Sequence, residues 1–510
     1  MRLLLINPRF PESFWSYEWM LKAILPGQRS INPPLGLATL AALSPAHWEV
    51  EIVDENIEPI PLLPEADIIG LCGMGVQFQR QKELLSYYRA RGHYVVAGGS
   101  YASLCPEQYA ELADSVVAGE AEYIWKEFCD DFEQGAPKSL YHETGTVALL
   151  DSPTPRFDLL KLERYSRASL QFSRGCPFRC EFCDIIVMFG RTPRVKNLEQ
   201  VGRELDELRH FNVRRVFFVD DNLIGNLPMA RKLLQYLKEY QERHDYWFSF
   251  GTEATLNMAQ HEDLLELFRA ANFGWVFIGI ESPDPASLEE TLKTQNLRED
   301  ILTSVRRIYS YGIEVAAGFI IGFDNDTLDT FERQYRFITD AGIQAAMIGL
   351  LTALPKTPLY DRLKKEGRLS TLEHASDNTR PSTNIIPKGM PYDDMVDSYI
   401  TLYCRLLADR EIALRIRNKL RHLSNPVYRS AYPPLEALGI LWRLVHRGIL
   451  PGGPIRLWHF LHSMPWLTPS RLPTVISDWI VGLSMRHFVE QRLIDRPRRA
   501  LIDLTSASGT

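Results

Sequence analysis

Short apolar runs alternate with helix-length segments along the first 145 residues of the chain. The alternation predicts buried strands at 2–7, 50–53, 67–72, 94–97 and 116–117, separated by helices at 35–43, 79–91 and 122–133. Strands that alternate with helices in this way form parallel sheets, so this region is predicted to be a doubly wound α/β domain. In such sheets ligands bind at the carboxyl ends of the strands.

A second alternating series follows a connector that contains Pro153 and Pro155. Six strands are expected, at 168–172, 215–219, 247–250, 275–280, 314–321 and 345–350, with helices such as 198–211 and 229–243 between them. Six βα units favour a partial (TIM-like) βα barrel over an open sheet, although periodicity alone does not separate the two. Beyond residue 356 no strand pattern remains. The predicted organisation is 1–145, a linker at 146–166, a barrel core at 167–385 and a helical domain at 386–510.

The composition is that of a globular protein, with 45% hydrophobic and 24% charged residues among 510. It excludes disordered, collagen-like and disulfide-scaffold classes. No run of about 18 apolar residues is present, and Pro8 and Arg9 interrupt the start, so we expect a cytoplasmic protein without a membrane span or secretion signal. The net charge of −7 conceals a basic tail, because residues 401–500 hold 16 Lys and Arg against 6 Asp and Glu. The acidic remainder disfavours nucleic acid as a partner, and the tail favours anionic lipid.

Turn residues follow four of the predicted strands in the N-terminal domain. Glycines after successive strands let a bulky ligand approach the backbone, although plain turn formation also explains them. The turn residues are Asn7, Pro8, Gly73, Met74, Gly75, Val76, Gly98, Gly99, Ser100, Gly119 and Glu120.

Cys176, Cys180 and Cys183 lie in SRGCPFRCEFCDI, directly after the strand predicted at 168–172. Three thiolates in this CxxxCxxC spacing can hold three irons of a four-iron, four-sulfur (4Fe–4S) cluster and leave the fourth iron open to a chelating ligand. A structural zinc site normally takes four protein ligands, and the other four cysteines of the chain are isolated. The alternative is a chance group of buried thiols without a metal.

The segment SRGCPFRCEFC resembles the signature of radical S-adenosyl-L-methionine (SAM) enzymes, including the aromatic Phe182 before the last cysteine. The resemblance implies that the open iron binds SAM and that polar residues at later strand ends complete the SAM pocket. Single acids at strand ends also cap helices, so the argument rests on their repetition after successive strands. The SAM-binding residues implied are Phe182, Asp220, Asp221, Asn222, Glu253, Gly279, Glu281, Ser282, Gly318 and Gly322.

An α/β domain before such a core resembles the cobalamin-binding domain of cobalamin-dependent radical SAM proteins, and VVAGGSYASLCPE and VVAGEAEYIWKEF match its turns. The resemblance implies that the eleven turn residues named above bind cobalamin. The DxHxxG motif that supplies an axial histidine in other cobalamin proteins is absent, and the region holds only His47, His93 and His142. We therefore expect no histidine below the cobalt and place the backbone of Gly73–Val76 there. A domain that has lost its cofactor is the alternative.

The helical extension and the segments CDIIVMFGRTPRVKN and FVDDNLIGN are similar to the subgroup that contains bacterial hopanoid C-2 and C-3 methylases. The resemblance implies a methyltransferase in which a 5′-deoxyadenosyl radical activates an unactivated substrate carbon and methylcobalamin supplies the methyl group. Cofactors carry this chemistry, so no general base is assigned. An external one-electron donor of flavodoxin or ferredoxin type is implied as a partner.

The tail suggests how a substrate reaches such a site. Trp and Arg in amphipathic helices favour peripheral contact with the inner face of a membrane, and hence a hydrophobic, hopanoid-like lipid as substrate. The alternative is that these helices only close the barrel. The residues concerned are Trp442, Trp458, Trp466 and Trp479, with Arg443, Arg447, Arg456, Arg471 and Arg486.

Three other functions share parts of this pattern. A cobalamin-dependent cyclase acting on a tetrapyrrole would have both N-terminal domains. A methylthiotransferase needs a second cysteine triplet before the first, and residues 1–175 contain none. A non-enzymatic iron–sulfur electron carrier needs neither the SAM-pocket acids nor the glycine turns.

Overall fold

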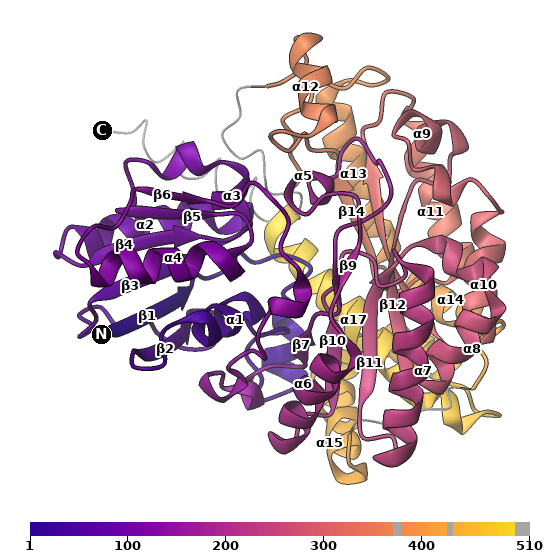
Figure 1. Cartoon of the computed structure of the whole chain (residues 1–510). Coiled ribbons are helices and arrows are strands. Elements are labelled where there is room, and N and C mark those ends of the chain that lie inside the picture. The colour runs from indigo at the N-terminus through magenta and orange to yellow at the C-terminus, as the bar shows by residue number, and fades with distance from the viewer. Residues whose placement is uncertain (371–379, 426–431, 495–510) are drawn as a thin grey trace, which may run out of the picture.

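The structure is a computed structural model that describes residues 1–370, 380–425 and 432–494. Its N-terminal domain holds a six-stranded sheet in the order β2-β1-β3-β4-β5-β6, and all neighbouring strands are parallel. Helices α1 and α4 pack on one face and α2 and α3 on the other, which confirms the doubly wound α/β domain (Figure 1). The elements are β1 (Arg2–Asn7), α1 (Leu35–Leu43), β2 (Glu49–Asp54), β3 (Ile68–Cys72), α2 (Phe78–Arg89), β4 (Tyr94–Gly98), α3 (Ser100–Leu104), β5 (Ser115–Ala118), α4 (Ala121–Glu133) and β6 (Leu140–His142).

Alternate side chains of the first strand explain the two helix layers. Leu3 and Leu5 are buried with α1 and α4, whereas Leu4 and Ile6 are buried with α2. Successive strand residues point to opposite faces of a sheet, so an all-apolar strand requires cover on both sides. Strand β6, three residues long, was not predicted because its sequence, LYH, buries only Tyr141.

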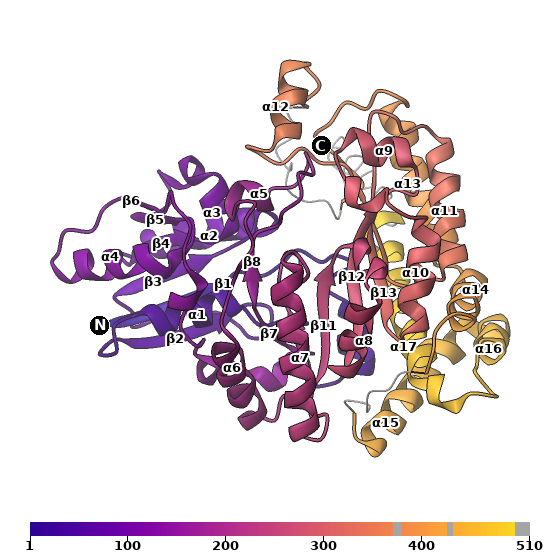
Figure 2. The same ribbon diagram turned by 45° about the vertical axis from the view of Figure 1, so that its right-hand side comes forward.

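The second sheet has six parallel strands in the order β14-β13-β12-β11-β10-β7. The order never reverses along the chain, so the connecting helices all lie outside the strands, as Figure 2 shows for α6, α7, α8, α10 and α11. This arrangement identifies the second sheet as a partial barrel and not as an open, doubly wound sheet. The strands are β7 (Ala168–Leu170), β10 (Arg215–Phe218), β11 (Ser249–Ala254), β12 (Phe273–Glu281), β13 (Glu314–Ile321) and β14 (Ala346–Leu350).

Helices and one small hairpin complete the barrel region. The hairpin pairs β8 (Ser173–Arg174) with β9 (Arg194–Val195) and encloses the cysteine segment. Strand β11 begins later than predicted, because Asp245 and Tyr246 take positive φ and the Trp247 indole donates to the Val213 carbonyl. The helices are α5 (Ile185–Met188), α6 (Leu198–His210), α7 (Leu227–Arg243), α8 (Glu262–Ala270), α9 (Pro285–Glu290), α10 (Ile301–Ser310), α11 (Asp329–Ala341) and α12 (Pro358–Lys365).

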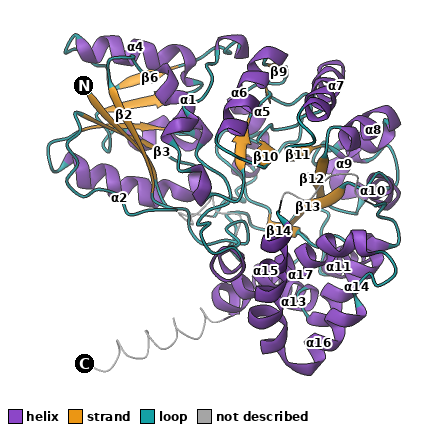
Figure 3. Ribbon diagram, turned by 90° about the horizontal axis from the view of Figure 1, so that it is seen from below, coloured by secondary structure: helices purple, strands orange, loops and turns teal. Residues whose placement is uncertain are grey.

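The C-terminal region is helical in its described part and packs beside β14, as Figure 3 shows for α13, α14 and α17. The hydroxyl of Tyr403 bonds both the N–H and the C=O of Ile348, and Tyr399 donates to the same carbonyl. Helix α13 therefore satisfies part of the exposed edge of β14, so these helices do close the barrel. They are α13 (Tyr392–Leu406), α14 (Asp409–Leu420), α15 (Pro434–Leu444), α16 (Gly453–His462) and α17 (Leu472–Val489). No described helix is long and apolar enough to cross a membrane.

Residues 8–34 leave the first domain between β1 and α1 and pack against the other two regions; we call this segment the excursion. The Phe14 ring lies 6.0 Å from Tyr403 and 5.8 Å from Phe488. Further along, Ile24 and Leu25 are buried among the C-terminal helices. The excursion therefore joins the first domain to the barrel and the C-terminal helices through apolar burial. Its irregular sequence offered no periodic signal for this role.

A buried ion cluster joins the C-terminal helices to the barrel. The Lys419 ammonium lies 2.6 Å from Glu314 at the start of β13 and 2.7 Å from Asp478 on α17. Lys419 and Asp478 are both buried. Removing one member of such a cluster leaves a buried charge without its counter-ion, which is costly.

Lys419→Met should therefore lower the free energy of unfolding by about 3–5 kcal/mol. Denaturant unfolding, followed by circular dichroism, measures the loss. Lys126→Met is the matched control, because Lys126 pairs with Asp130 on the exposed face of α4. We expect little change there, since solvent screens exposed pairs. Equal losses in both variants would contradict the structural role of Lys419.

Candidate active site

The three predicted cluster ligands lie on one loop inside the β8–β9 hairpin. Cys180 is buried, and Cys176 and Cys183 are partly buried. Two amides face the sulfurs: Asn222 Nδ2 lies 4.0 Å from Cys176 Sγ, and Gln295 Nε2 lies 3.7 Å from Cys180 Sγ. Hydrogen bonds to cysteine sulfur tune an iron–sulfur cluster, so this donor set fits one.

The environment of these thiols disfavours free thiolates. Burial raises the pKa of the Cys176 and Cys183 thiols, so both are protonated unless a cation replaces the proton. Among the described residues, no three His, Cys, Asp or Glu side chains converge on a site for a single ion. A 4Fe–4S cluster does not need such convergence, because each thiolate binds a different iron.

Asp220 and Asp221, both predicted to contact SAM, hold the cysteine loop in place. The Asp220 carboxylate accepts hydrogen bonds from Phe172 N at 2.8 Å and from Ser173 N at 2.7 Å. Asp221 accepts from Gly175 N at 2.9 Å. These bonds attach the backbone that leads into Cys176 to the end of β10. Asp220 and Asp221 therefore position the cysteine loop.

An ion network ties the same loop to the N-terminal domain. Arg174 lies 2.9 Å from Glu120 and 2.7 Å from Glu122, and Arg194 lies 2.7 Å from Glu120. The two glutamates are buried at the start of α4. Arg174 on β8 and Arg194 on β9 lie opposite each other in the hairpin. Glu120, predicted to bind cobalamin, therefore also fastens the cluster loop to the first domain.

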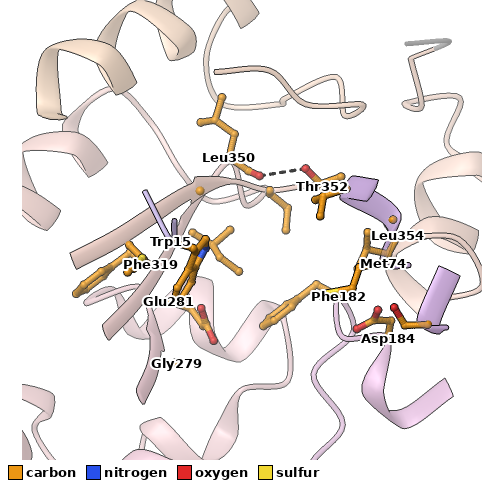
Figure 4. A pocket seen from close by; sticks show the side chains of 18 of the residues that line it. Trp15, Met74, Phe182, Asp184, Gly279, Glu281, Phe319, Leu350, Thr352 and Leu354 are labelled. Carbon is orange, nitrogen blue, oxygen red and sulfur yellow. Dashed lines mark hydrogen bonds between the residues drawn. The ribbon is translucent and has the colours of Figure 1, made fainter. Parts of the chain in front are cut away.

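A cavity of about 380 Å³ lies between the cysteine loop, the barrel strands and the N-terminal domain. Figure 4 shows Trp15 and Glu281 on one side of it, facing Phe182, Asp184 and Met74 on the other. Most of the lining is apolar. The predicted residues that line it are Phe182, Gly279, Glu281, Gly318, Met74, Gly75, Val76 and Ser100.

Glu281 is held in an uncommon conformation at the end of β12. Its φ is 65°, and its carboxylate lies 2.7 Å from the Lys293 ammonium. Asn296 Nδ2 donates to the carbonyls of Gly279 and Ile280 at 3.0 and 3.1 Å. Positive φ in a non-glycine residue is sparsely populated and is characteristic of functional sites. The structure thus presents a preorganised carboxylate to the cavity.

Other predicted SAM residues lie behind the lining. Ser282 is buried and its hydroxyl accepts from Asp284 N, while Gly322 N donates to Asp326. Glu253 is partly buried on β11. Burial, together with the nearby carboxylates of Asp221, Asp220 and Glu281, raises the pKa of Glu253 to about 8. Such a group of acids attracts a cationic ligand.

Sequence reasoning missed several residues of this site. Trp15 comes from the excursion, and Lys293, Gln295 and Asn296 come from the turn after α9. Among the residues that the structure describes, Gln295 Oε1 and Asn296 Oδ1 are buried without a hydrogen-bond partner. Unpaired buried acceptors are costly, which indicates that a donor group is expected there. The run K-T-Q-N has no recognisable spacing, so only the structure reveals it.

Two further cavities lie at the carboxyl ends of the N-terminal strands, and Ser100 lines both of them as well as the first. One, of about 1010 Å³, is lined by Asn7, Gly73 and Met74 together with much of the excursion. The other, of about 310 Å³, extends between α1 and the sheet and is lined by Gly98, Gly99, Gly119 and Glu120. Pro8 lines none of the three; its carbonyl accepts a hydrogen bond from Asn56.

Two adjacent glycines in this region differ in what they allow. Gly99 has φ of 101°, and a Cβ there would lie 2.5 Å from the Gly73 carbonyl oxygen. The close approach of two turns therefore requires glycine. A Cβ on Gly98 would meet only the Val117 carbonyl, at 3.7 Å, so the fold tolerates a side chain that points into the cavity.

Comparison with known proteins gives the family. Residues 170–338 match the radical SAM superfamily, and residues 357–496 match a domain of unknown function, DUF4070. The chain is 37% identical over 507 residues to an uncharacterized methyltransferase of Synechocystis sp., covering 97% of this chain and 93% of the relative. It is 35% identical to the hopanoid C-2 methylase of Rhodopseudomonas palustris, covering 82% of this chain and 80% of the relative. The chain belongs to the radical SAM methyltransferases.

Solved structures show the fold of this radical SAM methyltransferase. The cobalamin-dependent radical enzyme OxsB with aqua-cobalamin bound matches at a TM-score of 0.60 and 18% identity, covering 96% of this chain and 80% of that one. TsrM from Kitasatospora setae with cobalamin and a 4Fe–4S cluster bound also matches at 0.60, with 14% identity over 94% of this chain and 99% of that one. The predicted family and fold are confirmed, and the expected cofactors, a 4Fe–4S cluster, SAM and cobalamin, agree with both.

Replacing Cys176, Cys180 and Cys183 together with Ala should reduce iron and sulfide after anaerobic reconstitution from about four per chain to background. Metal analysis and the visible absorbance of the cluster measure the loss. Cys404→Ala, at an exposed position outside the loop, is the control and should bind iron as the wild type does. Retention of iron in the triple variant would rule out this ligand set.

The raised pKa of Glu253 gives a pH dependence with a definite sign. Glu253 is mostly protonated below about pH 8 and ionises above it. A cationic ligand stabilises the ionised form, so SAM should bind more tightly as pH rises from 6.5 to 8.5, by at most about tenfold per pH unit. Calorimetric titration at each pH measures this. The Glu253→Gln variant should lose most of the slope, and an unchanged slope would show that Glu253 is not coupled to SAM.

Proposed function

We propose that this radical SAM methyltransferase transfers a methyl group to an unactivated carbon of a hydrophobic small molecule, with a hopanoid-like lipid as the first candidate. The observation that carries this is the apolar cavity, which the cysteine loop and the strand ends of the N-terminal domain line together. The resemblance to a hopanoid C-2 methylase over most of the chain supports the lipid class. The matched relatives above 30% identity are named as methylases or methyltransferases, which favours transfer over cyclisation.

We assign the cofactors to the chain as follows. Cys176, Cys180 and Cys183 hold the 4Fe–4S cluster, and SAM lies beside Phe182, Gly279, Glu281 and Gly318. Cobalamin occupies the cavities of about 1010 and 310 Å³ that meet at Ser100. When bound, the cluster and SAM supply a radical that removes hydrogen from the substrate, and cobalamin supplies the methyl group.

The backbone of Gly73–Val76 lies under the proposed cobalt position. Histidine is absent from this turn in the sequence, and none of the three histidines of the domain lines the three cavities described above. His47 lines a separate, open hollow beside Arg2 and Glu49, at the amino ends of the strands. His93 bonds the Ala66 carbonyl before β3, and His47 pairs with Glu133. These contacts support a cobalt without a histidine ligand.

The remaining residues of the cavity exclude water and orient the substrate. The Trp15 ring packs against Phe277 at a tilt of 56°, with ring centroids 5.2 Å apart, and Phe319 adds a second apolar wall. Apolar walls bind a hydrocarbon by removing it from water, at about 25 cal/mol per Å² buried. They also keep water from reactive intermediates.

The direct test is anaerobic reconstitution, followed by incubation with SAM, cobalamin and a bacterial lipid extract. Mass spectrometry should show a lipid gaining one methylene, and the solution should contain both S-adenosylhomocysteine and 5′-deoxyadenosine. The Cys176→Ala variant is the control and should give neither the methylated lipid nor 5′-deoxyadenosine. Formation of 5′-deoxyadenosine without a methylated product or S-adenosylhomocysteine would favour another radical reaction, such as cyclisation.

Gly98→Leu should abolish cobalamin binding while preserving the fold, because its side chain enters the cavity rather than the protein. Retention of cobalamin absorbance after gel filtration should fall at least tenfold, which is about 1.4 kcal/mol. Thermal unfolding should stay unchanged. Ala90→Leu, at the exposed end of α2, is the control. Gly99 variants are unsuitable, because they would disturb the fold itself. Unchanged cobalamin binding by Gly98→Leu would show that cobalamin does not bind in this cavity.

An exposed apolar surface on the C-terminal helices supports access from a membrane. Leu435 is 85% exposed, Trp442 58%, Trp466 71% and Leu467 97%. Two parts of the sequence expectation are wrong. Trp479 is fully buried and donates to Ser463, and arginines such as Arg443 and Arg456 bond backbone carbonyls or Asp409. Membrane contact therefore rests on the exposed Trp and Leu residues more than on cations.

Flotation with anionic liposomes tests this contact. The full chain should float at low salt, and a variant with Trp442, Trp458, Trp466 and Leu467 changed to Ser should not. The control changes Leu62 and Leu63, exposed in the first domain, to Ser. Truncation is unsuitable, because the C-terminal helices bury the excursion. A wild-type chain that stays in the soluble fraction would favour a water-soluble substrate.

A further inference from the structure

The cysteine loop has two sides with different chemistry. Phe182 and Asp184 face the cavity. Arg179, between two of the cysteines, is exposed, and so is Arg191, whose guanidinium lies 3.2 Å from the Pro177 carbonyl. The loop therefore separates the apolar cavity from a basic outer surface.

Helix α12 extends this basic surface. Arg362 lies 2.7 Å from the Glu181 carboxylate, and Leu359 N donates to the Glu181 carbonyl at 3.0 Å. These bonds fasten α12 to the middle of the cysteine loop. Lys364 and Lys365 are exposed on the helix, and Lys356 is exposed just before it. We call Arg179, Arg191, Lys356, Lys364 and Lys365 the loop-side basic patch.

The patch carries an excess of positive charge, because the nearby carboxylates form ion pairs with cations outside it. Glu181 pairs with Arg362, and Asp324 pairs with Arg362, Arg368 and Lys388. Within the described residues, no carboxylate forms an ion pair with the five patch cations. The exposed acids nearby are Asp361 on α12, Glu366 directly after α12 and Glu107 after α3. Of these, Glu366 pairs with Arg362, Arg368 and Lys388, none of which belongs to the patch. Residues 1–400 carry net negative charge, so this basic surface departs from its surroundings.

We propose that the loop-side basic patch docks an acidic one-electron carrier protein of the flavodoxin or ferredoxin class. The inference rests on the proposed function, because reductive cleavage of SAM consumes one electron that this chain does not supply. The carrier loses one electron and the oxidised cluster gains it, with no bond made or broken at the patch. Complementary charge steers such encounters and raises their rate at low salt.

Location favours a protein over a membrane as the partner of this patch. In Figures 1 and 2, α12 lies at the top of the molecule and α15, which carries part of the exposed apolar surface, at the bottom. The patch also lacks the exposed Trp and Leu residues of that surface. A carrier can therefore reach the cluster while the opposite end contacts lipid.

Charge reversal on α12 tests the proposal without touching the cysteine loop. Lys356→Glu/Lys364→Glu/Lys365→Glu should weaken the binding of a bacterial flavodoxin at least tenfold at low salt, as measured by calorimetry. It should slow cluster reduction by flavodoxin hydroquinone in stopped-flow absorbance to a similar extent. Reduction by dithionite, and SAM cleavage driven by it, should be unchanged. Dithionite thus separates a failure of docking from a failure of the proposed function.

The matched control reverses three exposed cations elsewhere, Lys82→Glu/Arg203→Glu/Lys232→Glu, on α2, α6 and α7. It should bind flavodoxin within twofold of the wild type. A second variant, Arg179→Gln/Arg191→Gln, should weaken binding without reversing charge. Equal effects in the α12 variant and the control, or no effect in either, would overturn the proposal. So would selective loss of binding to phosphatidylglycerol vesicles or to an oligonucleotide with flavodoxin binding intact.

Discussion

The position of the cysteine loop depends on the buried ion network of Arg174, Arg194, Glu120 and Glu122. Buried charges are stable only when paired, so the two arginines of the hairpin fix its distance from the first domain. Glu120 also lines the cavity of about 310 Å³. One carboxylate therefore contacts the strand that enters the cluster loop and also lines the space proposed for cobalamin, so in this proposal Glu120 sets the spacing of the two cofactors.

The apolar cavity is a consequence of this spacing. Its walls come from the barrel strands, the cysteine loop, the turns of the first domain and the excursion, and no single segment encloses it. Of the carboxylates near it, Glu281 is paired with Lys293, and Asp220 is turned to the backbone. Hence the space next to the cluster is largely apolar, while the negative potential of the acids behind it remains available to a cationic ligand.

Local patterns made the fold and the cysteine motif predictable, whereas contacts between distant segments did not appear in the sequence. Strand β13 and helix α1 have the predicted bounds because apolar runs and flanking turns define them locally. The ion pair between Glu120 and Arg194 joins residues 74 positions apart, and no sequence spacing predicts it. Trp479 illustrates the same limit, because a Trp on an amphipathic pattern is buried or exposed according to what packs against it.

The cysteine loop must satisfy two opposite requirements, a dry site and an exposed surface, and each of its two sides satisfies one of them. Radical chemistry needs a dry site, whereas electron delivery from another protein needs an exposed, hydrated surface. The alternation of residues along the loop provides both: Arg179 faces solvent, Cys180 is buried, and Phe182 faces the cavity. Because Cys180 lies between Arg179 and Phe182 in the sequence, a cluster held by the loop lies between its solvent side and its cavity side. In the proposed arrangement, the electron carrier docks on the outer side of the loop, and the apolar cavity on the inner side can stay closed while the electron is transferred.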